Sequence, residues 1–261
     1  MANEQDPSTI VVDIDAGIAT VTLNRPERLN GITNTMMIEL HRALVTLAHD
    51  PDVRVLVLTG AGKGFCPGAD LKHYSDGEAD QPLPAETFDI TLLLHEMPAV
   101  TIAAVNGACA GAGLGWAAAC DLRVAAEGAR FSSAFLDVAV AGDMAGPWTL
   151  PRILGAAKAR ELYFLPEKFD AAEAHRIGLV SRVFPDASFP AETRALAERL
   201  AGKAPLALRG MKANFVAAER TSLADFIALE TERHQRITAS DDCREAFSAF
   251  VEKRVPTFKG R

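Results

Sequence analysis

Residues 101–124, TIAAVNGACAGAGLGWAAACDLRV, restrict the possible folds more than any other part of the chain. Ile102 to Val105 is typical of a short buried strand, and Asn106-Gly107 of a sharp turn. Gly111-Ala112-Gly113 then begins an apolar helix that is expected to end before Asp121. Small residues let a ligand approach the main chain, and the first turn of a helix offers backbone N–H groups without partners. The stretch therefore predicts a site for negative charge on an oxygen, either a phosphate or an oxyanion formed during a reaction.

Length and composition indicate one substantial core, or a core with a smaller appended piece. The chain has 261 residues, of which 49% are hydrophobic and 23% charged. No uninterrupted apolar run is long enough for a membrane span and the start lacks a leader pattern, so a cytoplasmic protein is expected. The net charge of −7 argues against nucleic-acid partners. The four cysteines form no regular framework, which favours reduced thiols over disulfides or a metal site.

Strands dominate the first half of the chain and helices the second. Ile10 to Ile14 and Ile18 to Leu23 alternate as a hairpin does, and residues 53–59, VRVLVLT, read as a buried strand. Between them, a helix from Thr35 to Ala48 would place Met36, Leu40, Leu44 and Leu47 on one face. Short strands are expected at 122–125 and 129–131, and a helix at 85–96. From Pro147 onward the periodicity is helical almost to the end.

A second glycine-rich stretch, GAGKGFCPGADL at 60–71, also follows a strand. Its N–H groups near Ala69 could face the same cleft as those of Gly111 to Gly113, so that two loops hold one oxygen. The stretch lacks the GxxxxGK[ST] pattern of a phosphate-binding loop. The glycines at 111, 113 and 115 do not complete a dinucleotide fingerprint, because Trp116 follows them. An oxyanion is therefore favoured over a phosphate.

The chain resembles the crotonase family, the enoyl-CoA hydratase and isomerase superfamily. The resemblance covers nearly the whole chain and rests on five blocks in the same order as in the family: NRPERLNGI, GKGFCPGADL, IAAVNGACAGAGLG, CDLRVAAEGARF and EKRVPTFKGR. It implies an α/β fold with a spiral of repeated ββα turns in residues 1–195, followed by helices in residues 196–261 that form trimers or dimers of trimers. It also implies a coenzyme A thioester as substrate, with no permanently bound cofactor.

The resemblance assigns roles to particular residues. The N–H groups of Ala69 and Ala112 would hold the thioester oxygen as it becomes an enolate. Arg28 would meet the phosphates of coenzyme A, and the main chain of Ala69, Asp70 and Leu71 its adenine. Lys253 would reach the phosphates from a neighbouring subunit.

The acid and base residues depart from the prototype hydratase of the family. Gly115 and Phe135 stand where that enzyme has two glutamates, and neither can transfer a proton. Asp143 remains nearby, at a position where some isomerase and dehalogenase branches have a catalytic aspartate. We expect Asp143 to move a proton between carbons of an enoyl thioester; the alternative is that it caps a helix starting near Ala145.

Three functions remain open after the sequence. An isomerase is favoured over a hydratase with different catalytic groups and over an acyl-CoA-binding protein with little turnover. The acyl pocket is expected to involve Trp116, Phe135, Met144 and Trp148, and a loop at 74–86 that could cover the cleft. Cys66 is interpreted as packing, because no histidine is placed to activate it.

Overall fold

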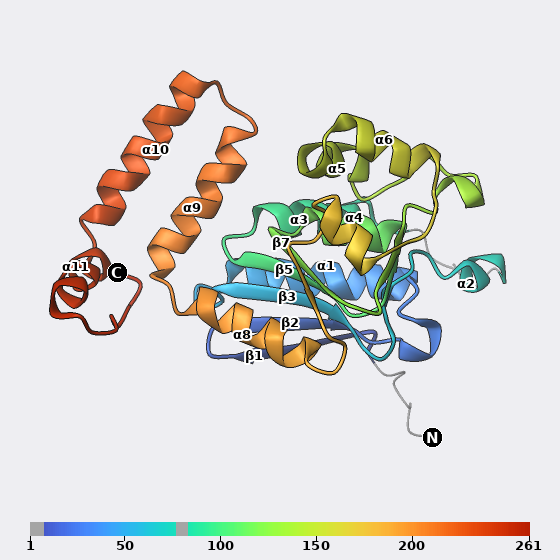
Figure 1. Ribbon diagram of the computed structural model, residues 1–261, viewed down its shortest axis with the longest axis horizontal. Helices are drawn as coiled ribbons and strands as arrows, with labels where there is room; N and C mark the ends of the chain where they lie inside the picture. Colours follow the sequence, from blue (N-terminus) through green and yellow to red (C-terminus); the bar gives the residue numbers. More distant parts are fainter. Residues whose placement is uncertain (1–7, 77–82) are drawn as a thin grey trace.

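Two sheets of unequal size form the centre of the molecule (Figure 1). The computed structural model describes residues 8–76 and 83–261. The larger sheet has the strand order β1-β2-β3-β5-β7-β10, and the smaller has the order β4-β6-β8-β9. Their strands are β1 Ile10–Asp15, β2 Ile18–Leu23, β3 Val55–Gly60, β4 Gly64–Cys66, β5 Val100–Val105, β6 Ala108–Ala110, β7 Leu122–Ala126, β8 Arg130–Ser132, β9 Phe169–Asp170 and β10 Arg182–Phe184. The expected hairpin is confirmed, since β1 pairs antiparallel with β2.

The order of strands follows a repeated unit. The strand pairs β3–β4, β5–β6 and β7–β8 each place their first strand in the larger sheet and their second in the smaller one. Within each sheet these strands are parallel and lie in the same sequence, as successive turns of a spiral require. The loops that follow β4 and β6 leave the same edge of the smaller sheet, because parallel strands end on the same side. Both glycine-rich stretches therefore reach one place.

Helices cover both faces of the larger sheet, α1 (Asn34–His49) on one and α8 (Phe189–Ala201) on the other (Figure 1). The buried side chains of α1 include Met36, Leu40, Leu44 and Leu47, as the periodicity predicts, and Thr33 caps its first turn. Every residue of α4 is buried, which explains why that helix is apolar all round. The helices are α1 Asn34–His49, α2 Leu71–Ser75, α3 Ile90–Glu96, α4 Ala112–Ala119, α5 Gly146–Leu154, α6 Ala156–Phe164, α7 Ala171–Arg176, α8 Phe189–Ala201, α9 Pro205–Ala218, α10 Leu223–Thr238 and α11 Asp241–Glu252. Short 3-10 helices span Pro26–Arg28, Ala85–Asp89 and Leu136–Val138.

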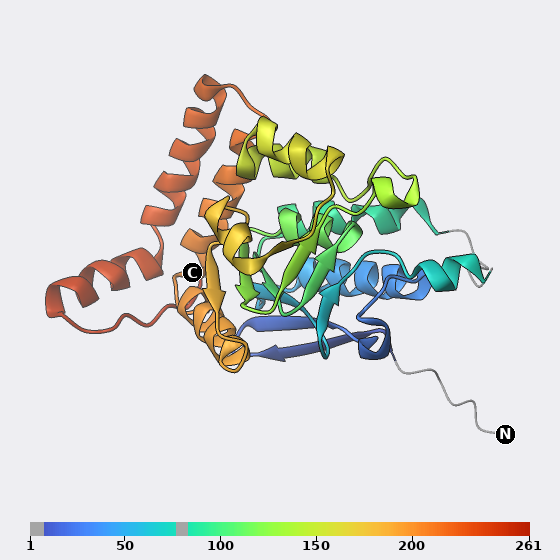
Figure 2. The same cartoon turned by 45° about the vertical axis from the view of Figure 1, so that its right-hand side comes forward.

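The last three helices extend away from the sheets. Figures 1 and 2 show α9 and α10 as an antiparallel pair, with α11 beyond them at the opposite end of the molecule from α2. Helix α8 spans residue 195 and packs against the larger sheet through Phe189, Ala197 and Ala201. The division at 195 expected from the sequence thus falls inside α8. No helix in the described parts of the chain has the length and apolar character of a membrane span.

Candidate active site

The first amide donor lies in the loop between β4 and α2. Gly68 has φ +96°, a conformation that favours glycine. Around it, Ile32 N–H donates to the Gly68 carbonyl at 2.9 Å and Asp70 N–H donates to the Ile32 carbonyl at 3.0 Å. Since neighbouring residues of extended chain point their backbone groups to opposite sides, the Ala69 N–H points away from Ile32. It donates to no atom within the described residues and so is available to a ligand.

The second amide donor lies at the start of α4. Gly111 precedes the helix with φ +53° and ψ −127°, which only glycine adopts readily, and Ala112 is the first helical residue. The Ala112 N–H belongs to the first turn and has no intrahelical partner. A side chain at Gly111 would lie 3.6 Å from the Cα atom of Gly68, so the two loops touch. The structure therefore brings together the two predicted donors. Ala69 directly follows Gly68 and Ala112 directly follows Gly111, the two glycines at which the loops touch.

Two arginines hold the first loop in place. Asp70 accepts hydrogen bonds from Arg28 Nε at 3.1 Å and Nη2 at 2.8 Å, and from Arg25 Nη2 at 3.1 Å. Its carboxylate also accepts from the His73 N–H at 3.3 Å and thereby caps α2. The Arg28 guanidinium, its strongest partner, holds the pKa of Asp70 well below the usual range. The Asp70 side chain thus fixes the Ala69 amide in place, whereas contact of the Asp70 main chain with the adenine of coenzyme A stays a prediction.

A cavity of about 510 Å³ opens beside the two donors. It brings together Ala69, Leu71 and Ala112 with Phe135, Asp143 and Met144, six of the residues expected at the site. Most of the remaining lining is apolar: Ile32, Met37, Pro67, Leu83, Phe88, Ala134, Val138 and Val140. Within the part of the chain that the structure describes, the cavity therefore offers two amide donors and one carboxylate in apolar surroundings, which is the usual composition of a small-molecule site.

Asp143 is the ionisable acid in the lining of this cavity. Its side chain is open to the cavity, yet desolvation by the surrounding protein raises its pKa above the ordinary aspartate value. The cap of α5 is Ala145, and no side chain caps that helix. The alternative that Asp143 serves as a cap is thus wrong. A carboxyl group whose ionised form is disfavoured is better suited to accept a proton.

At Gly115 and Phe135, the positions that the resemblance matches to the prototype glutamates, neighbouring groups fill the space. A Cβ atom at Gly115 would lie 2.5 Å from the Met144 Cβ and 2.9 Å from the Met144 carbonyl oxygen. The space for a side chain is therefore taken by Met144. Phe135 is 7% exposed and stacks on Tyr163 with ring centroids 5.8 Å apart, so it packs as an apolar wall.

Five predicted residues lie outside the lining of this cavity, and one of them is Asp70, described above. Trp116 is fully buried in the core, and Trp148 lines a neighbouring cavity. Arg28 is paired with Asp70, as described above, and its side chain is 38% exposed. Lys253 directly follows α11, which lies at the opposite end of the molecule from α2 (Figure 1).

Two tyrosines near Asp143 had no recognisable signal in the sequence. Desolvation and then the Asp143 charge raise the pKa of Tyr74, and the same two causes raise that of Tyr163 to about 12. Both phenols are thus neutral near Asp143 at physiological pH. Burial likewise raises the pKa of the Cys66 thiol to about 12, which agrees with its interpretation as packing. Part of the expected covering loop, residues 77–82, lies outside the described residues.

Comparison with known proteins identifies the family. The enoyl-CoA hydratase/isomerase profile matches residues 13–261. The chain belongs to the enoyl-CoA hydratase/isomerase family. The resemblance seen in its sequence blocks is thereby confirmed.

Its relatives include proteins named for both reactions. A protein of Rhodobacter capsulatus named "Probable enoyl-CoA hydratase" is 38% identical over 258 residues, covering 97% of this chain and 98% of the relative. The 1,2-epoxyphenylacetyl-CoA isomerase of Escherichia coli is 35% identical over 261 residues, with the same coverage. The crystal structure of an enoyl-CoA hydratase from Bacillus anthracis superposes with a TM-score of 0.88 at 30% identity, covering 97% of this chain and all of that one. The crotonase-like α/β fold is confirmed by this agreement.

Proposed function

We propose that this family member is an isomerase that shifts a double bond in an enoyl-CoA thioester by proton transfer. The observation that carries the proposal is the pairing, in one apolar cavity, of two unpartnered amides at Ala69 and Ala112 with one carboxylate, Asp143. Water addition in the prototype uses two carboxylates, and the lining formed by the described residues of this cavity offers one. Moving a proton from one carbon to another needs only a single group that first accepts the proton and then returns it.

The chemistry follows from these groups. The carboxylate of Asp143 removes a proton from C2 of a 3-enoyl thioester, and the electron pair of that C–H bond delocalises through the C3–C4 double bond and the carbonyl. The negative charge that develops on the thioester oxygen is held by the N–H groups of Ala69 and Ala112. Each such donor contributes roughly 3 to 4 kcal/mol when it is fixed in advance. Asp143 then returns the same proton to C4, which leaves a double bond between C2 and C3 and regenerates the carboxylate.

Coenzyme A would bind at the rim of the first cavity, along the surface between Leu71 and Arg28. Leu71 is 56% exposed, as an apolar side chain that covers a ligand would be. Arg28 keeps N–H donors beyond those used on Asp70, and these would meet the phosphates. Lys253 would contribute only from another copy of the chain, because α11 and α2 lie at opposite ends of one copy.

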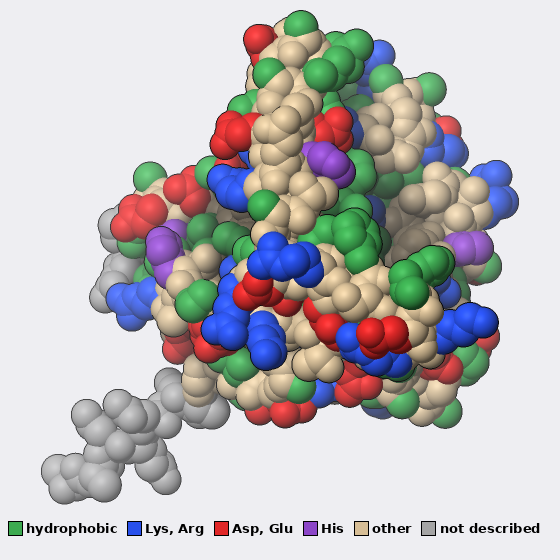
Figure 3. Space-filling view, turned by 90° about the vertical axis from the view of Figure 1, so that its left-hand side faces the viewer, with side chains coloured by type: hydrophobic (Ala, Val, Ile, Leu, Met, Phe, Trp, Pro, Cys, Tyr) green, Lys and Arg blue, Asp and Glu red, His purple; other side chains and the backbone are tan. Residues whose placement is uncertain are grey.

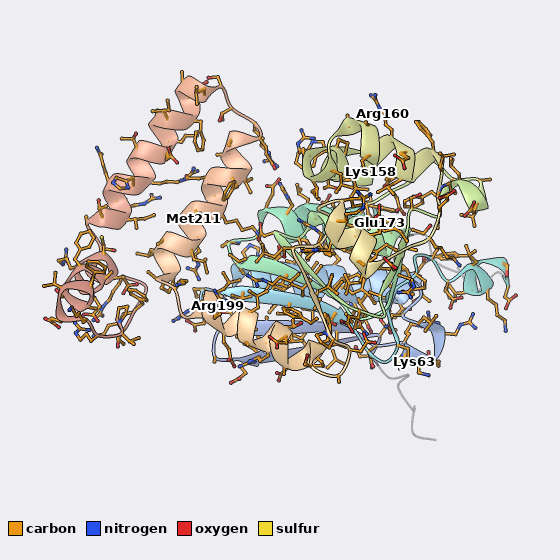
Figure 4. The ribbon with its side chains drawn as sticks, viewed as in Figure 1. Lys63, Lys158, Arg160, Glu173, Arg199 and Met211 are labelled. Atoms are coloured by element: carbon orange, nitrogen blue, oxygen red, sulfur yellow. The ribbon has the colours of Figure 1, made fainter. Side chains whose placement is uncertain are left out.

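Association of copies through the C-terminal helices belongs to this proposal. Large apolar side chains on these helices are exposed, among them Phe215 at 71%, Leu223 at 75% and Phe250 at 85%. Figure 3 views this end of the molecule, where apolar side chains lie at the surface among charged ones. Met211 of α9, labelled in Figure 4, lines a groove of about 680 Å³ between α9 and α10. Several large apolar side chains exposed on one set of helices favour burial of these helices against other copies, as trimers or dimers of trimers.

The test is a panel of 2-enoyl-CoA and 3-enoyl-CoA thioesters, assayed with the wild type and Asp143→Asn. We expect conversion of 3-enoyl to 2-enoyl thioesters by the wild type, with kcat reduced about a hundredfold or more in the variant and acyl-CoA affinity nearly unchanged. Full activity of Asp143→Asn would refute the role of Asp143. Incorporation of labelled water into crotonyl-CoA would instead indicate a hydratase, and tight binding without turnover would indicate an acyl-CoA-binding protein.

A further inference from the structure

A second cavity, of about 570 Å³, adjoins the first. The two cavities share two lining residues, Phe88 and Met144. The second lies between α3, α5 and the end of α9, and its other lining residues are Asp89, Thr91, Leu92, His95, Ala145, Trp148, Thr149, Glu219 and Arg220. Nothing in the proton transfer described above uses this space.

Met144 combines a fixed backbone with an adaptable side chain at the boundary of the two cavities. Its φ of +49° follows Gly142 at +106° and precedes Ala145 at +54°, and its main chain packs directly on Gly115. Its sulfur accepts a hydrogen bond from Thr91 Oγ1 at 3.5 Å, an interaction that is weak for a thioether. A methionine side chain has three rotatable torsions and adapts to differently shaped neighbours. The side chain can therefore move while the backbone stays in place.

The lining of the second cavity is mixed, and its large apolar side chains are open to solvent. Phe88 is 47% exposed, Leu92 48% and Trp148 38%, and all three line it. The Trp148 ring is held by the Arg152 guanidinium, 3.8 Å from its centroid. At the edge of the cavity, His95 Nε2 lies 2.7 Å from Glu219 Oε2. Neighbouring large apolar side chains left open in a preformed cavity are typical of a ligand site.

We propose that the second cavity receives the far end of the acyl group and that Met144 determines which acyl groups reach it. This proposal rests on the proposed acyl-CoA chemistry. A short acyl group fits within the first cavity, whereas an extended one must displace the Met144 side chain and then gains contact with Phe88, Leu92 and Trp148. The substrate class is thus a thioester with an extended apolar acyl group, a medium or long alkyl chain or one ending in an aryl ring.

The test compares 3-hexenoyl-CoA with 3-dodecenoyl-CoA for the wild type, Met144→Ala and Met144→Phe. Alanine and phenylalanine, like methionine, disfavour the positive φ of residue 144, so neither substitution relieves the backbone strain as glycine would. We expect the wild type to prefer the longer substrate in kcat/KM. Met144→Phe should lower the dodecenoyl/hexenoyl ratio at least roughly tenfold, the scale on which apolar pockets discriminate size. Met144→Ala should keep or raise that ratio.

Two further variants separate the pocket from general damage at Met144. Leu92→Ala touches only the second cavity and should lower kcat/KM for the longer substrate alone, even where a Met144 variant folds poorly. Met37→Ala, in the first cavity only, should affect both substrates alike. If both Met144→Phe and Leu92→Ala leave the ratio unchanged, the inference is overturned while the proposed function stands.

A binding measurement keeps the inference testable apart from turnover. Calorimetric titration with hexanoyl-CoA and dodecanoyl-CoA, which carry no double bond to move, reports the affinity ratio for the same variants. Absence of turnover in the wild type would refute the proposed function. The inference would then stand if Met144→Phe still lowered the dodecanoyl/hexanoyl affinity ratio about tenfold, and would fail if that ratio did not change.

Discussion

Gly115 offers a direct test of whether Met144 leaves room for a side chain at this position of α4. Gly115→Ala adds a Cβ atom 2.5 Å from the Met144 Cβ and 2.9 Å from its carbonyl oxygen, closer than real Cβ contacts. Overpacking of this kind destabilises by about 1 to 3 kcal/mol, whereas replacing glycine by alanine inside a helix stabilises by up to about 1 kcal/mol. The net expectation is a loss of about 1 to 2 kcal/mol. At about 2 to 4 °C per kcal/mol for a domain of this size, the melting temperature should fall by roughly 2 to 8 °C.

Gly210→Ala in α9 is the matched control. It is also a glycine within a helix, but its added Cβ would meet only the terminal Cδ1 atom of Ile237, at 2.5 Å, and that flexible end can shift. Both variants are compared by urea and thermal unfolding at one protein concentration, because association makes melting temperatures depend on concentration. Equal or higher stability of Gly115→Ala relative to the wild type would refute the claim that Met144 excludes a side chain here. The double variant with Met144→Gly, which removes the closest contact, should recover part of the loss.

Three further predictions concern charge. The acid limb of the pH profile of kcat/KM should titrate above the ordinary aspartate pKa, because desolvation raises the pKa of Asp143. Val140→Ser, which makes the cavity lining more polar, should shift this limb to lower pH. A limb at the ordinary aspartate pKa would contradict desolvation as the cause. A raised pKa in the folded state favours the protonated form, so the Asp143 contribution to stability is present below the unfolded pKa and lost as pH rises through the folded one. Asp143→Asn should therefore melt above the wild type at pH 7 and lose this advantage in acid, which thermal unfolding at both pH values measures. Arg28→Ala and Lys253→Ala should each raise KM for acyl-CoA in a salt-dependent way; unchanged KM at low salt would count against both contacts.

Local sequence patterns predicted the strands and helices whose apolar residues recur at a clear period, and the loops that are rich in glycine. The hairpin of β1 and β2 and the buried face of α1 follow from alternation and from 3.6-residue spacing. The two amide loops were predicted from small residues that follow strands at 60–71 and 111–113, and the structure adds that Gly68 and Gly111 have positive φ where the loops touch.

Other features had no local signal. Strands β6, β9 and β10 have only two or three residues, too few to show a period, and exist because neighbouring strands pair with them. The alternative of a helix cap at Asp143 fails because Met144 and Ala145 adopt positive φ, which neither residue type favours and no local pattern signals. An apolar helix cannot reveal which of its faces meets a cavity, so the sequence could not separate Trp116, which is fully buried, from true lining residues.

The geometry of the site depends on backbone strain in the segment from Gly142 to Gly146. Met144 and Ala145 both hold left-handed backbone, which costs of order 1 to 3 kcal/mol for each non-glycine residue, and α5 begins without a side-chain cap. Two neighbours fix this path: Gly115, which leaves room for the Met144 backbone, and Tyr163, whose ring lies against Gly142. The same path leaves Asp143 open to the first cavity and Met144 at the boundary with the second. Because one strained turn positions both residues, replacing Gly115 by a larger residue would disturb the proposed base and the acyl boundary together.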